Sequence, residues 1–110
     1  MTDTNLSDQI LSDVGRIFSS LGDPSRLKIL RALLDAEGPL SQGAVIEATG
    51  LTQANASKHL SHLVQVGLVL REPAGSMAFF RPVKPIVPEV CALVCRHAKD
   101  RIQTAYASLT

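Results

Sequence analysis

A polar and cationic stretch near the middle of the chain carries residue types that can read DNA. Residues 51–64 have the sequence LTQANASKHLSHLV, which contains no carboxylate. At about 100° per residue, Asn55, Lys58 and His62 share one side of a helix, and His59 flanks them. Small donors and acceptors beside a lysine can enter a major groove without repelling the phosphates. The stretch therefore predicts a recognition helix, with an ordinary solvated helix face as the alternative.

The opposite side of this stretch is apolar and is expected to face a protein core. Helical spacing places five small or apolar residues there, namely Ala56, Leu60, Leu63, Val64 and Gly67. Thr52 comes just before the helix, and its hydroxyl can accept a hydrogen bond from a free N–H group of the first turn. We expect the recognition helix to span about residues 52–66.

The residues before this helix predict a helix-turn-helix. A short helix is expected over about residues 41–49, and Gly50 suits the left-handed position that follows a helix C-terminus. Two helices joined so closely, with glycine between them, form a helix-turn-helix. A further helix before it begins at Asp23 and Pro24, because aspartate caps helices and proline suits the first helical position.

A β-hairpin is expected directly after the recognition helix, over about residues 68–82. Two apolar runs flank residues 73–76, which have the composition of a turn. Such a hairpin would act as a wing that carries Arg71 and Arg81. These arginines are placed to meet phosphate or the minor groove, and the alternative is that they only keep a strand edge polar.

Two long apolar helices are expected at the ends of the chain, over about residues 5–21 and 85–108. A domain of 110 residues has too small a core to bury all of their apolar surface, so we expect them to form a symmetric homodimer interface. The predicted fold class is mainly α with a small β-hairpin. It is a winged helix-turn-helix of five helices plus a wing, in a single domain over residues 1–110.

The charge distribution favours nucleic acid as a partner. The net charge is only +1, but residues 52–84 carry four lysines and arginines against one carboxylate, whereas residues 1–51 are acidic. No apolar run is long enough to span a membrane, and the polar N-terminus is unlike a signal peptide. Two cysteines without an export signal indicate a cytoplasmic protein. No glycine-rich phosphate loop, nucleophile elbow or acidic pair indicates an enzyme.

The motifs resemble the ArsR/SmtB family of winged-helix repressors. Residues 21–33, LGDPSRLKILRAL, are similar to the second-helix signature of the family, and residues 51–60, LTQANASKHL, are similar to its recognition helix. The likeness extends over about residues 6–108. It implies a homodimeric repressor that leaves its operator on sensing a metal, metalloid or redox signal. It also implies that the DNA-contacting residues are Gln53, Asn55, Ser57, Lys58 and His59.

The sensor sites of that family are not reproduced. Residues 41–45, SQGAV, lack the Cys-x-Cys element of the metal-sensing members. The zinc-sensing pattern on the last helix is also absent, because Glu89 and Cys91 stand in its first half and Ile102 in its second. Neither standard site is therefore carried over to this chain.

Cys91 and Cys95 are the remaining candidates for a sensor. They are four residues apart on the last expected helix, so they share one face at a Cβ separation of roughly 5–6 Å. That spacing suits two thiolates that hold one soft metal or metalloid ion, whereas a disulfide would distort the helix or link two subunits. His97 points away from Cys95 and cannot complete the site. A redox or sulfur signal, and a simple role as buried apolar residues, stay open.

Two functions remain for the fold as a whole. One is a sequence-specific, DNA-binding transcriptional repressor released by an inducer. The other is a winged-helix protein-interaction module that pairs through its outer helices and reads no DNA.

Overall fold

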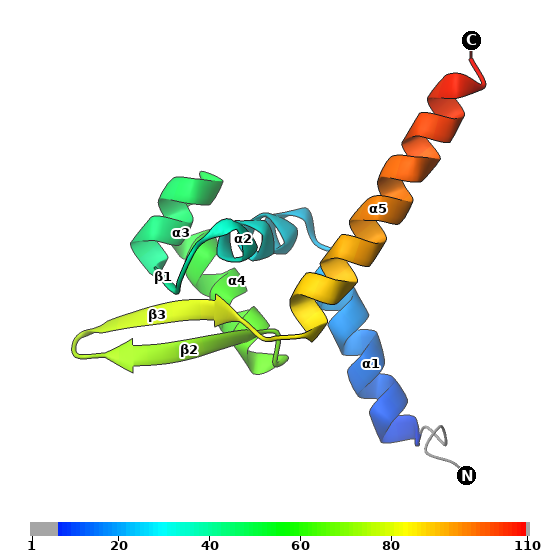
Figure 1. Ribbon diagram of the computed structural model, residues 1–110. Helices are drawn as coiled ribbons and strands as arrows, with labels where there is room; N and C mark the ends of the chain where they lie inside the picture. Colours follow the sequence, from blue (N-terminus) through cyan, green and yellow to red (C-terminus); the bar gives the residue numbers. More distant parts are fainter. Residues whose placement is uncertain (1–6, 110) are drawn as a thin grey trace.

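The computed structural model describes residues 7–109, which form five helices and a small antiparallel sheet (Figure 1). The helices are α1 (Asp8–Leu21), α2 (Pro24–Asp35), α3 (Gln42–Thr49), α4 (Gln53–Gln65) and α5 (Ile86–Ala107). The strands are β1 (Leu40–Ser41), β2 (Val69–Ala74) and β3 (Met77–Pro82). The predicted fold class, mainly α with a hairpin wing, is confirmed.

Side-chain caps fix where the helices of the DNA-binding unit begin. Thr52 accepts a hydrogen bond from the backbone N–H of Asn55 at 3.2 Å, and Asp23 accepts one from Arg26 at 3.0 Å. Gly50 lies between α3 and α4 with a φ of 75°, a left-handed conformation that favours glycine. The tight helix-turn-helix joint is thus specified by single residues, as the sequence predicted.

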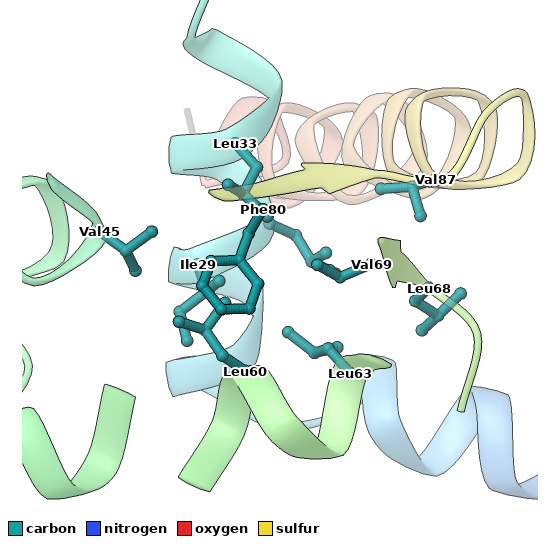
Figure 2. Packing of buried hydrophobic residues seen from close by; sticks show 10 residues of the cluster. Ile29, Leu33, Val45, Leu60, Leu63, Leu68, Val69, Phe80 and Val87 are labelled. Atoms are coloured by element: carbon teal, nitrogen blue, oxygen red, sulfur yellow. The ribbon is translucent and has the colours of Figure 1, made fainter. Parts of the chain in front are cut away.

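The core is a cluster of aliphatic side chains closed by one phenylalanine (Figure 2). Helix α2 contributes its buried side to the centre, α4 lies across from it, and the sheet and the start of α5 complete the cluster. Its fully buried large members are Ile29, Leu30, Val45, Leu60, Leu63, Leu68, Val69 and Val87. Helix α4 therefore packs against the core with one face, and the core does not cover its opposite face.

The sheet differs from the prediction in two respects. The hairpin turns at Gly75, whose φ is 64°, and Pro73 lies within β2, paired with Ala78 of β3. Proline is tolerated there because β2 is an edge strand in the order β1-β3-β2. The two-residue strand β1 also pairs with β3, with Leu40 opposite Phe80. A strand of two residues is too short for a periodic signal.

The outer helices leave much apolar surface uncovered in the single chain. All residues of α5 from position 92 onward are exposed, and Figure 1 shows this half of the helix projecting from the rest of the molecule. Phe18 on α1 is 65% exposed and Ile102 on α5 is 66% exposed. No helix among residues 7–109 is both long and apolar enough to cross a membrane.

Candidate nucleic-acid interface

The outer side of α4 presents a compact polar surface. Gln53, Asn55, Ser57 and Lys58 are all exposed, because Ala56 and the two buried leucines of α4 turn toward the core. No residue of α4 is acidic. The free N–H groups at the start of the helix add partial positive charge at the same end. We call these four exposed residues the α4 outer face, and it can donate and accept hydrogen bonds at base edges while attracting phosphate.

His59 does not belong to the α4 outer face, which corrects its sequence-based assignment. Its side chain is only 8% exposed, since it lies one helical turn after Ala56 and one turn before Leu63 on the buried side. Its Nδ1 atom has no hydrogen-bond partner among residues 7–109. A side chain enclosed in this way cannot reach a base or a phosphate.

His62 is the second correction, because it faces helix α1 instead of the outside. Its Nε2 atom lies 2.7 Å from the Oγ atom of Ser20, and the ring is half-buried. Ser20 itself is completely buried near the end of α1. The docking of α1 against α4 thus covers a position that helical periodicity alone assigns to the DNA-facing side.

The two arginines of the wing are not equivalent. Arg71 on β2 is exposed, and within residues 7–109 it takes part in no ion pair. Arg81 on β3 is also exposed, but its Nε atom donates to the Oε2 atom of Glu72 at 3.0 Å. Arg81 lies opposite Leu70, and Glu72 is two residues further along β2. Arg81 and Glu72 are therefore diagonal neighbours on one face of the hairpin. Arg71 is therefore the wing residue with an unengaged positive charge.

The cysteines line a groove on the other side of the domain. Cys91 is half-buried against the core, Cys95 is exposed, and both border a groove of about 680 Å³ between α2 and α5. Lys28 and Arg31 of α2 lie on its wall. Burial raises the pKa of the Cys91 thiol, and the neighbouring Cys95 raises it further. Within residues 7–109, no three histidine, cysteine or acidic side chains are placed to hold a metal ion.

Known proteins with similar sequences are transcriptional regulators. A family model described as a helix-turn-helix domain matches residues 21–72. A probable mercury resistance operon repressor of Streptomyces lividans is 33% identical over 85 residues, 77% of this chain and 66% of that protein. An uncharacterized HTH-type transcriptional regulator of Methanocaldococcus jannaschii is 35% identical over 78 residues, 71% of this chain and 86% of that protein.

A solved structure shares the whole architecture. It is the homodimeric winged helix-turn-helix DNA-binding domain of a possible ArsR-family transcriptional regulator from Mycobacterium bovis. The two chains superpose with a TM-score of 0.78 at 30% identity, over 91% of this chain and 94% of the other. For several curated relatives the matched region covers between 48% and 66% of their own length.

Proposed function

The chain belongs to the ArsR/SmtB family of winged helix-turn-helix regulators, and on that premise we propose that it is a homodimeric repressor that binds operator DNA through α4. The observation that carries the proposal is the α4 outer face, which is exposed, free of carboxylates and held outward by the buried stripe of the same helix. Gln53, Asn55, Ser57 and Lys58 are the proposed base- and phosphate-contacting residues. His59 and His62 are withdrawn from that set.

The proposed dimer places two copies of this surface on one duplex. The exposed apolar side chains of α1 and α5 supply the interface, and the Mycobacterium bovis relative is described as homodimeric. An isologous interface relates the two recognition helices by a twofold axis. Dimeric helix-turn-helix proteins read two half-sites about one helical turn, roughly 34 Å, apart. We therefore expect a pseudo-palindromic operator and a protein that acts in the cytoplasm.

The wing is proposed to contact the phosphate backbone, chiefly through Arg71. Replacing Arg71 by alanine should weaken binding to operator and unrelated duplexes alike, because a phosphate contact carries no sequence information. Each lost phosphate contact makes the negative slope of log K against log salt shallower by about 0.9. A dimer that loses one contact in each subunit should therefore have a slope shallower by about 1.8. Fluorescence anisotropy at a series of salt concentrations measures the slope.

Arg81 provides the matched control on the other strand of the wing. Because its guanidinium already pairs with Glu72, Arg81→Ala should change the slope less than Arg71→Ala does. An unchanged slope in Arg71→Ala, or a larger change in Arg81→Ala, would contradict the proposed division between the two.

Release of the operator is proposed to involve Cys91 and Cys95. A soft metal or metalloid ion that binds the pair would displace the thiol protons, and the raised pKa of Cys91 makes that displacement more costly at neutral pH. Binding should therefore strengthen as the pH rises. A ligand in the groove between α2 and α5 can shift α5 and thereby the dimer interface.

Replacing both cysteines by serine tests this part of the proposal. The double variant should bind the operator as the wild type does but lose its response to arsenite, cadmium or a hydroperoxide, each of which reacts with thiols. The readout is the operator affinity with and without each compound. If the wild type responds and the double variant responds equally, the two cysteines are only lining residues of the groove.

The interaction module without DNA binding is the second candidate function. The extensive exposed apolar surface of α1 and α5 favours it, since such a surface serves a protein partner as well as a second copy. Specific retention of one duplex selected from a random pool, at physiological salt, would exclude it.

A further inference from the structure

A polar junction joins the recognition helix to α1 and lies outside both the α4 outer face and the cysteine groove. Its members are Ser20 of α1, Asp23 and Arg26 at the start of α2, and His59 and His62 of α4. Ser20 is completely buried, and His59 and His62 are buried or half-buried. Most of the remaining interior is aliphatic, so this polar contact is specific to the meeting point of three helices.

The hydrogen bonds at the junction have defined directions. The Ser20 hydroxyl donates its single proton to the carbonyl oxygen of Arg16 at 2.8 Å. It must then accept at its other contact, so the Nε2–H group of His62 donates to Ser20 Oγ at 2.7 Å. Any additional proton on the ring binds at Nδ1. The hydrogen bond thus holds α4 to a buried atom of α1, across 42 positions in sequence.

The other junction members secure the end of α1. The Nε atom of Arg26 donates to the carbonyl oxygen of Ser20 at 2.8 Å, and an Nη atom of Arg26 reaches the carbonyl oxygen of Ser19 at 3.3 Å. A guanidinium suits the C-terminal end of a helix, where carbonyl groups lack partners and the dipole is negative. Asp23 caps α2 through the N–H of Arg26, and this hydrogen bond lowers the pKa of Asp23, which stays ionised near neutral pH.

We propose that His62 is a positioning residue for DNA binding: its hydrogen bond to Ser20 fixes the recognition helix relative to α1 and so sets where the two α4 outer faces lie in the dimer. The inference rests on the proposed DNA-binding function. Helix α1 belongs to the proposed dimer interface, whereas α4 belongs to the proposed DNA interface. Because the polar junction fixes α4 relative to α1, it also fixes the position of each recognition helix relative to the twofold axis of the dimer.

Acid pH should destabilise this junction, because the second ring proton binds at Nδ1 and places a positive charge beside Arg26 and His59, while the Nε2–H group still donates to Ser20. Burial lowers the pKa of His62 below its ordinary value of 6.5, and the charges of Arg26 and then His59 lower it further, against an opposing effect of Asp23. Folded protein therefore takes up this proton less readily than unfolded chain. The contribution of neutral His62 to the stability of the folded state is complete above about pH 6.5. It is lost as the pH falls through the lower pKa that His62 has in the folded state. Asp23 titrates below this range, because its pKa is itself lowered from 3.8.

Three variants test the proposal on a duplex selected with the wild-type protein from a random pool at pH 7.5. His62→Gln keeps an N–H donor near the position of Nε2 but does not titrate. His62→Leu removes the donor. His97→Gln is the matched control, because His97 is exposed on α5. Dissociation constants are measured from pH 5.5 to 8 at constant ionic strength, and sedimentation gives the mass of each protein.

We expect wild type and His97→Gln to lose affinity together by about three- to tenfold between pH 7.5 and 5.5, because a charged His62 ring is disfavoured where it packs beside Arg26 and His59. His62→Gln should bind equally at all pH values, and His62→Leu should be about tenfold weaker at pH 7.5. A His62→Gln variant that titrates like the wild type would overturn the inference, even if His62→Leu fails to fold. Wild-type protein that selects no duplex would instead overturn the proposed function itself, together with this inference.

Discussion

Replacing Asn55 and Lys58 together by alanine should lower affinity for the operator by at least about a hundredfold. Both side chains are exposed on α4, and neither takes part in the core. A good base-edge contact is worth about 1–3 kcal/mol, and the dimer loses each contact twice. Two losses of about 1.4 kcal/mol already correspond to a factor of one hundred. The measurement is the dissociation constant for the selected duplex and for a scrambled duplex.

The two duplexes separate the roles of the two residues. Lys58 attracts phosphate as well as bases, so part of the loss should also appear on the scrambled duplex, whereas the loss of the Asn55 contact should appear only on the operator. Lys28→Ala is the matched control, because Lys28 is an exposed lysine on the wall of the groove between α2 and α5. Unchanged affinity and unchanged sequence preference in the double variant would remove α4 as the DNA-reading element.

The double substitution of Phe18→Glu and Ile102→Glu should convert the dimer to monomers and abolish tight operator binding. These side chains are about two-thirds exposed in the single chain and lie on the two helices proposed to form the interface. A carboxylate buried there would be desolvated without a partner, which strongly disfavours association. A monomer binds one half-site only, so the gain from joining two half-sites, about a hundredfold or more, is lost.

Sedimentation at micromolar protein concentration checks the mass, and circular dichroism checks that the helices remain. Gln103→Glu adds one negative charge at an exposed polar position of α5 and should leave the dimer intact. If the doubly substituted protein stayed dimeric, α1 and α5 would not form the interface, and the spacing of the recognition helices would need another explanation.

Much of the architecture could be predicted because local chemistry determines it. The caps at Asp23 and Thr52 and the left-handed Gly50 each fix a helix boundary through neighbouring residues. The hydrophobic spacing of α4 identified its buried stripe, and the same spacing placed Asn55 and Lys58 outside. For these residues the side of the helix follows from the stripe alone, so no knowledge of the neighbouring helices is needed.

The two histidines of α4 show where local reasoning ends. His59 lies beside the apolar stripe and His62 lies opposite it, so the burial of each depends on which other parts of the chain pack against α4. Ser20, the partner of His62, is 42 positions away in sequence, and no periodic pattern in α1 marks a serine as a buried acceptor. The composition of residues 73–76 likewise predicts a turn that includes Pro73, whereas Pro73 lies in β2. A strand tolerates proline there because β2 is at the sheet edge, and the position of a strand within its sheet is not a local property of the sequence.

Hydroxyl-radical footprinting of the wild-type protein on the selected duplex tests the central claim most directly. We predict two protected patches about one helical turn apart on one face of the duplex, one for each α4 of the dimer, and both should vanish when Asn55 and Lys58 are replaced by alanine. A single patch, uniform protection along the duplex, or an unchanged pattern in that variant would contradict a twofold repressor that reads DNA with this helix.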